Sequence, residues 1–303
     1  MPAATRNLAM SKPLLASEHK SPDPGCGPAS TADWERKRAL LRARLMKRRL
    51  PWLNKDELEA HFTGMPWRYW AGVNEEDLLL HLRTVHAFFQ SLTAPETEGT
   101  APVVSWRQIP ERGVTEVLVC NWDRQGLLVK VAGAFATVRI NIVQAVVYTR
   151  ADNVVLDVFE VCDPERREIQ DESLLHKMVC LLEAAVSQPP SVSFITGRHL
   201  EKQEPPASGQ PAQAPSRPTI RFDNESSNDC AVLEIAMPDR LGLLYELLQV
   251  LTACGVNISQ AIVSTEQGLA RDRFHVTDAV SGAGLAPPRM GLIRARLAEA
   301  IGT

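Results

Sequence analysis

Apolar and polar positions follow the same plan at two places along the chain. At the clearer one, the run 231–236 has the composition of a strand, and Leu244, Leu247, Leu248 and Leu251 recur at the spacing of one helix face. Between the two patterns stands Asp239-Arg240-Leu241-Gly242-Leu243-Leu244, and the similar Asp123-Arg124-Gln125-Gly126-Leu127-Leu128 occurs 116 positions earlier. The pattern predicts a strand–turn–helix unit that is used twice.

The repetition extends past the turn. In the first copy we expect strands at 114–120, 140–149, 154–162 and 192–196, and helices at 126–135 and 172–186. In the second copy we expect strands at 230–236, 257–265 and 270–277, helices at 242–254 and 288–301, and an edge strand at 220–223. The complete order, β-α-β-β-α-β, is that of a ferredoxin-like domain. The fold class expected is therefore α+β, with two such domains.

A helical region is expected ahead of the first copy. The run 34–50 is rich in Arg and Lys, which predicts either a helix that grips nucleic acid or a solvated helix with a packed Leu/Met stripe. Asn54 and Asn74 can each cap a following helix. The segment 63–72 is predicted to be a loop, and the aromatics in its Met65-Pro66-Trp67-Arg68-Tyr69-Trp70 form either an internal anchor or an exposed docking patch.

These patterns divide the chain of 303 residues into five parts. We expect a disordered tail over 1–30, the helical region over 31–95, the first repeated domain over 112–198, a linker over 199–218 and the second repeated domain over 219–303. A net charge of −3 gives no indication of a nucleic-acid partner, and no apolar run is long enough for a signal peptide or a membrane span. The six cysteines form no Cys-x-x-Cys pair, so reduced, mostly buried thiols in a cytoplasmic protein are expected.

The repeated turn is the candidate binding site. Gly126 and Gly242 would let the backbone approach a neighbour closely, and the helix that follows begins with unpaired N–H groups that suit a small carboxylate. Asp123 and Asp239 can cap that helix or accept the amino group of a zwitterion, and Asn141 and Asn257 are either ligand-reading amides or turn residues. The candidate ligand-binding residues are Asp123, Arg124, Gly126, Leu127, Asn141, Ile142, Asp239, Arg240, Gly242, Leu243, Asn257 and Ile258.

Sequence motifs for catalysis are absent. The chain contains no Gly-x-Ser-x-Gly, no phosphate-binding loop and no histidine spacing that predicts a metal site. No catalytic residue, cofactor or metal ligand is therefore assigned.

Three segments of the second copy resemble an ACT domain, a small regulatory fold that binds amino acids, commonly where two such units pair. They are 238–244, Gly255-Val256-Asn257-Ile258 and Phe274-His275-Val276-Thr277-Asp278. Together with Phe222-Asp223-Asn224-Glu225 and the upstream Met65-Pro66-Trp67-Arg68-Tyr69, the tandem pair is similar to the C-terminal region of the bifunctional PII uridylyltransferase/uridylyl-removing enzymes. The resemblance implies glutamine sensing, allosteric regulation and a place in nitrogen metabolism.

The catalytic motifs of that family are missing. Its nucleotidyltransferase domain needs Gly-Ser and Asp-x-Asp, and its hydrolase domain needs His-Asp, and this chain has none of the three. We therefore expect a non-catalytic regulatory protein that binds an amino acid, with glutamine implied by the resemblance. Two alternatives stay open: the regulatory part of a split enzyme that partners PII or a nucleotidyltransferase, and an ACT module that only mediates homo-oligomerisation.

Overall fold

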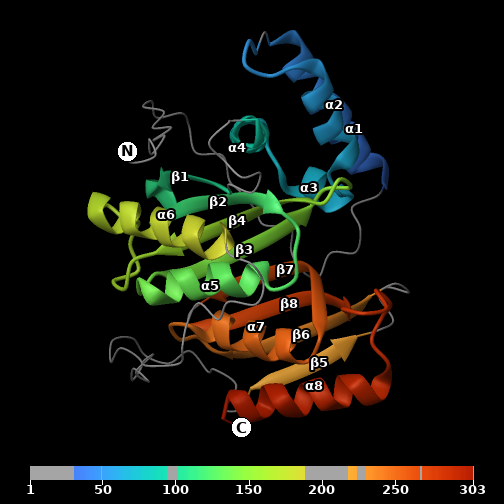
Figure 1. Cartoon of the computed structure of the whole chain (residues 1–303), viewed down its shortest axis with the longest axis vertical. Helices are drawn as coiled ribbons and strands as arrows, with labels where there is room; N and C mark the ends of the chain where they lie inside the picture. The colour runs from blue at the N-terminus through green and yellow to red at the C-terminus, as the bar shows by residue number, and fades with distance from the viewer. Residues whose placement is uncertain are drawn as a thin grey trace. The chain divides into compact units, whose positions relative to one another are not determined.

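The computed structural model describes residues 31–48, 50–93, 102–187, 218–223, 230–266 and 268–302 (Figure 1). It confirms an α+β fold, in which eight strands join one sheet in the order β1-β2-β4-β3-β7-β8-β6-β5. The strands are β1 Val103–Ile109, β2 Val114–Trp122, β3 Asn141–Thr149, β4 Val154–Cys162, β5 Thr219–Asp223, β6 Ala231–Pro238, β7 Val256–Glu266 and β8 Leu269–Asp278. The helices are α1 Thr31–Lys47, α2 Lys55–Gly64, α3 Trp67–Gly72, α4 Glu75–Leu92, α5 Leu127–Thr137, α6 Glu172–Ser187, α7 Leu243–Ala253 and α8 Pro287–Ala300, with a 3-10 turn η1 at Pro110–Arg112.

Contacts divide the chain into two units. Unit 1 comprises Met1–Arg107, Leu118–Asp123 and Tyr148–Leu156, and unit 2 comprises Gln108–Val117, Arg124–Val147 and Asp157–Thr303. The helical region thus belongs to unit 1, and most of both β-α-β-β-α copies belongs to unit 2. The expected tail 1–30, the final strand 192–196 and nearly all of the linker 199–218 lie outside the described residues.

The helices of unit 1 begin where the sequence predicts. The Asn54 side chain accepts a hydrogen bond from the Glu57 N–H (2.7 Å), and Asn74 accepts one from Asp77 (2.9 Å). The loop expected at 63–72 is wrong, because Trp67–Gly72 forms the short helix α3. Its Tyr69 and Trp70 are fully buried in the core of unit 1, so they are an internal anchor.

The basic helix α1 is tied to other helices of unit 1. Lys37 donates to the Ala71 carbonyl (2.9 Å), Arg42 pairs with Glu59, and Arg44 and Arg48 each lie 3.3 Å from Glu75. These contacts favour the interpretation of α1 as a packed helix with a solvated outer face.

A polar chain crosses the apolar core of unit 1. The Tyr69 hydroxyl lies 3.0 Å from His61 Nε2 and 2.9 Å from His81 Nδ1. His61 is fully buried, and burial, followed by the charge of Arg150 and by His81, lowers its pKa well below the ordinary value. His61 is therefore neutral in the folded unit.

This burial predicts a loss of stability in acid. Because the folded-state pKa of His61 is depressed, the unfolded chain takes up a proton first, and stability should fall as the pH drops below about 6.5. Urea unfolding followed by tryptophan fluorescence at pH 7.5 and pH 5.5 measures the difference. His61→Gln, which cannot titrate, should reduce it. An undiminished difference in that variant would assign the acid sensitivity to other groups.

The two copies meet inside unit 2. Strands β3 and β7 pair antiparallel, with Gln144 opposite Ser264, Ala145 opposite Val263 and Val146 opposite Ile262. Ile262 follows Val146 by 116 positions, so each of these two residues faces its own counterpart in the other copy. The pairing of β3 with β7 therefore relates the two copies by a local two-fold axis near Val146 and Ile262.

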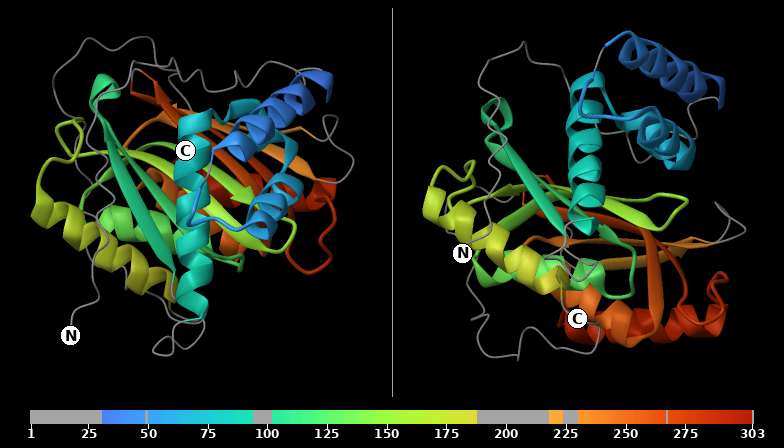
Figure 2. Two further views of the ribbon diagram at one scale, coloured as in Figure 1. Left: turned by 90° about the horizontal axis from the view of Figure 1, so that it is seen from above. Right: turned by 45° about the horizontal axis from the view of Figure 1, so that its top comes forward.

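Four helices of unit 2 cover one face of its strands (Figures 1 and 2). They pack in the order α6, α5, α7, α8, because α5 contacts both α6 and α7 and α7 contacts α8. The pairing of α5 with α7 brings the two copies together a second time, beside the join of β3 and β7.

The two sheet edges are occupied by β1 and β5, each of which precedes its copy. The outer strand expected after the second helix of the first copy, at 192–196, lies outside the described residues. The strand at 220–223 is confirmed as β5, whereas β1 was not predicted. Only one of the seven β1 residues is buried, so β1 lacks the alternation that identifies a strand.

No disulfide bond joins the five cysteines of the described ranges. Cys120 and Cys162 are buried, Cys180 is exposed, and Cys230 and Cys254 are intermediate, so the expectation of mostly buried thiols is wrong. Across the described residues, no group of three or more His, Cys, Asp or Glu side chains is placed to hold a metal ion. No helix of these ranges has both the length and the apolar content that a membrane span requires.

Candidate ligand site at the second turn

Glycine starts the helix after each repeated turn. Gly126 and Gly242 are the N-cap residues of α5 and α7, both with φ of 78° in the left-handed region that glycine adopts without strain. A Cβ on Gly126 would meet no atom within 4 Å. The expectation of a close backbone approach is therefore wrong for Gly126, which is needed for its backbone conformation.

Asp239 does not cap helix α7. The N-cap residue is Gly242, and no side chain donates or accepts a cap hydrogen bond there. The Asp239 N–H donates to the Gly268 carbonyl (2.8 Å), and its carboxylate accepts from Thr265 and lies 3.5 Å from Arg166 Nη2. The cap interpretation of Asp239 is thus wrong, and its side chain faces a pocket.

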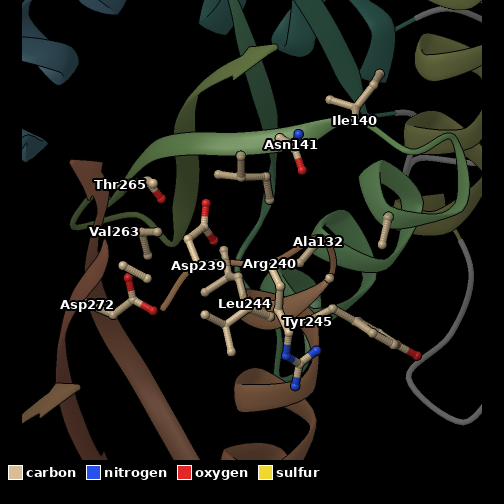
Figure 3. Close-up of a pocket in the computed structure, with 15 residues that line it drawn as sticks. Ala132, Ile140, Asn141, Asp239, Arg240, Leu244, Tyr245, Val263, Thr265 and Asp272 are labelled. Carbon is tan, nitrogen blue, oxygen red and sulfur yellow. The ribbon is translucent and has the colours of Figure 1, made fainter. Parts of the chain in front are cut away.

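The pocket combines both copies (Figure 3). The first copy contributes the start of β3 with Asn141 and Ile142, and one face of α5. The second copy contributes the turn, the start of α7 and the strands β7 and β8. The lining residues are Ala132, Ala136, Ile140, Asn141, Ile142, Asp239, Arg240, Gly242, Leu243, Leu244, Tyr245, Val263, Thr265, Ala270 and Asp272.

The pocket contains two carboxyl groups, those of Asp239 and Asp272. Burial raises the pKa of Asp239, opposed by the Thr265 hydrogen bond and by Arg166. Burial, followed by the charge of Asp239, raises the pKa of Asp272 to about 8. The guanidinium of Arg240 is held by Glu246, with Nη1 to Oε1 at 2.6 Å. The pocket is thus an acidic site beside the start of a helix.

The pocket brings together six of the twelve sequence-predicted residues. Asn141, Ile142, Asp239, Arg240, Gly242 and Leu243 line it, and Asp123, Arg124, Gly126, Leu127, Asn257 and Ile258 do not. Sequence reasoning placed each asparagine with the turn of its own copy, whereas Asn141 of the first copy joins the turn of the second. Asp123 and Asn257 are exposed.

Asp272 was missed as a site residue. The available signal was the period of two in β8, where Ala270, Asp272 and Phe274 are all buried on one face. A carboxylate within that apolar set indicates a special environment.

The first turn differs in charge from the second. Lys130 stands where the second copy has Glu246, so Arg124 lacks the carboxylate that Arg240 has. Two guanidinium nitrogens of Arg124, Nε and Nη2, are buried without a hydrogen-bond partner. Burial, followed by the charge of Arg124, lowers the pKa of Lys130. The two turns are therefore not equivalent.

Lys130→Glu should stabilise the protein. The new carboxylate would pair with Arg124 as Glu246 pairs with Arg240, which should raise the free energy of unfolding by about 0.5–1 kcal/mol. The reciprocal change, Glu246→Lys, should lower it by a similar amount. Chemical denaturation of both variants at one pH measures the two changes in the free energy of unfolding. A destabilised Lys130→Glu protein would show that Arg124 lies out of reach of position 130.

The sequence is similar to those of one group of enzymes. The bifunctional uridylyltransferase/uridylyl-removing enzyme of Gluconobacter oxydans (strain 621H) is 31% identical over 235 residues, which is 76% of this chain and 23% of that protein. The proteins of the same name from Bradyrhizobium sp. (strain BTAi1 / ATCC BAA-1182) and Rhodospirillum rubrum are each 30% identical, over 80% of this chain and 25% and 24% of theirs. The resemblance inferred from the motifs is confirmed, and the chain spans about a quarter of the length of these relatives.

Other comparisons add little. No family model matches the chain. The match to a solved structure, an unknown protein from Galdieria sulphuraria, covers 67% of this chain and 94% of that one. Its sequence identity of 15% and TM-score of 0.21 are too low to indicate a shared fold.

Proposed function

We propose that this chain is a cytoplasmic regulatory protein that binds an amino acid between its two β-α-β-β-α copies, which we interpret as ACT domains, and that it is not itself a catalyst. The observation that carries the proposal is the pocket in which Asn141 of the first copy faces the Asp239–Leu244 turn of the second. L-Glutamine is the first candidate ligand, on the strength of the resemblance to the uridylyltransferase/uridylyl-removing enzymes.

The chemistry of the pocket suits a zwitterion. The N–H of Leu244, in the first turn of α7, has no intrahelical acceptor and can bind a carboxylate at the positive end of the helix dipole, whereas the Leu243 N–H donates to the Arg240 carbonyl (3.1 Å). Asp239 can accept the ammonium group, and the amide of Asn141 can read a polar side chain. Each polar part of an amino acid thus has a matching group.

Binding would change the join between the copies. The cavity has a volume of about 30 Å³, which holds roughly two water molecules, so an amino acid needs lining side chains to move apart. Tyr245 on α7 and Arg240 in the turn before α7 both line the pocket, and these are the side chains that we expect to move. Since α7 packs on α5, this movement would be transmitted to the other copy. Allosteric coupling of this kind is typically about 1–3 kcal/mol.

A thermal-shift screen of the common L-amino acids, followed by calorimetric titration, tests the proposal. L-Glutamine should raise the melting temperature and bind with one site per chain. The full chain alone should not transfer uridylyl groups to a PII protein. If no amino acid binds at millimolar concentration, the sensing function is wrong, and a module that only mediates homo-oligomerisation becomes the better account.

A second function is favoured by the extent of the alignments. Because the chain spans 23–25% of its curated relatives, it could regulate a separately encoded nucleotidyltransferase. Affinity purification of the tagged chain from its native cells should then recover that enzyme or PII. Recovery of neither, together with glutamine binding, would leave the stand-alone sensor.

A further inference from the structure

Asp272 is a buried carboxyl group that lacks a hydrogen-bond partner at Oδ1. It lies on β8, lines the pocket, is only 4% exposed, and its Oδ1 accepts no hydrogen bond from any described residue. A carboxylate removed from water without a partner is unfavourable. The position of Asp272 therefore points to a group that is supplied from outside the chain.

The basic side chains around the pocket have acidic partners other than Asp272. Arg240 is held by Glu246, Arg273 of the same strand by Glu234, and Arg166 lies against Asp239. The remaining titratable neighbours, Tyr245 and Cys162, have pKa values raised by burial, to about 11 for Cys162, and are neutral at pH 7. Among the described residues, no basic side chain forms an ion pair with Asp272. The pocket thus combines two carboxylates with one peripheral guanidinium.

This arrangement matches a single small cation. Asp239 comes from the turn before α7, and Asp272 comes from β8, so the two carboxylates approach the cavity from different elements (Figure 3). An ammonium group has three donors, which can reach more than one carboxylate oxygen. Hydrogen bonds of this charged type are stronger than neutral ones.

We propose that Asp272, together with Asp239, forms the subsite for the ammonium group of the bound amino acid, and that it makes the pocket select amino acids over the corresponding deaminated acids. This inference rests on the proposed function and assigns a specificity-determining residue to it. The carboxylate of the same amino acid would lie at the start of α7.

A proton should leave the site on binding. In the free protein, the Asp272 carboxyl holds a proton at pH 7 because its pKa is raised to about 8. An ammonium group beside it favours the carboxylate, so the proton passes to the buffer as the ion pair forms. One coupled proton would make binding up to about 50-fold tighter at pH 8 than at pH 6.

Isothermal titration with L-glutamine at pH 7, in phosphate and in Tris, counts the released protons from the difference in heat. The wild-type protein should release about one proton. Asp272→Asn should release none, and its affinity should not change between pH 6 and pH 8. Asp157→Asn is the matched control, since Asp157 is the equivalent of Asp272 in the first copy, is 1% exposed, and does not line the pocket. It should behave as the wild type.

A second probe separates this inference from the proposed function. Glutaramate, which is glutamine without its amino group, should bind the wild-type protein at least about tenfold more weakly than L-glutamine, and this preference should shrink in Asp272→Asn. Equal binding of the two compounds, or binding of glutamine without proton release, would overturn the role of Asp272 and leave amino-acid binding intact. Failure of all common amino acids to bind would overturn both. The wild-type measurements do not depend on whether the variant folds.

Discussion

Asp239→Ala is expected to weaken the binding of L-glutamine by about 10- to 100-fold. The carboxylate of Asp239 faces the pocket and can accept the ammonium group, and loss of a hydrogen bond to a charged group costs about 1.5–3 kcal/mol. The affinity should fall without loss of the fold, because Asp239 makes no helix-cap hydrogen bond and its ion-pair partner Arg166 is half exposed, so that only the hydrogen bonds from Thr265 and the Arg240 N–H are lost with it. Calorimetric titration at pH 8 measures the change.

The repeat provides a matched comparison. Asp123 occupies the same position in the first turn, but it is exposed and does not line the pocket. Asp123→Ala should therefore bind L-glutamine within about twofold of the wild type. If the two variants lost affinity equally, the turns would be equivalent and the placement of the ligand beside Asp239 would be wrong.

Trp70→Ala should lower the stability of unit 1 by about 3–5 kcal/mol, the usual cost of removing a fully buried large aromatic side chain. Trp70 is completely buried, stacks on Phe62 with ring centroids 4.7 Å apart, and meets Tyr69 edge-on at 4.9 Å. Truncation would leave a cavity at the centre of the helical core. Urea unfolding followed by far-UV circular dichroism measures the loss.

Trp67→Ala is the control within the same helix α3. Trp67 is 39% exposed, so its truncation should cost less than about 1 kcal/mol. A similar loss in both variants would mean that the helix, and not the buried anchor, determines stability. An unaffected Trp70→Ala protein would contradict the core described for unit 1.

Local patterns predicted the local structure well. The apolar stripes at helical spacing, Asn54 and Asn74 as caps, and the glycine at each turn all correspond to what the structure shows. These features depend on residues within a few positions of each other. The short helix α3 was missed because Pro66 and the aromatic cluster favour a loop in isolation, whereas tertiary packing of Tyr69 and Trp70 stabilises a helix.

The composition of the site could not be predicted from local patterns. Asn141 reaches the turn of the second copy only because β3 pairs with β7 and α5 packs on α7, and these contacts join residues more than 100 positions apart. The repeat revealed two similar turns but not which strand faces which turn. The charge difference between Lys130 and Glu246 is visible in the sequence, but the sequence does not show that Glu246 pairs with Arg240.

The most direct test of a ligand site built from both copies is the affinity of L-glutamine for Asn141→Ala and for Asn257→Ala, measured by calorimetry in the full chain. Asn141 lines the pocket, and Asn257, its counterpart 116 positions later, is exposed and does not. Asn141→Ala should lose affinity by about tenfold or more, and Asn257→Ala should change it within about twofold. Loss of affinity in Asn257→Ala with normal binding in Asn141→Ala would contradict a ligand site built from both copies.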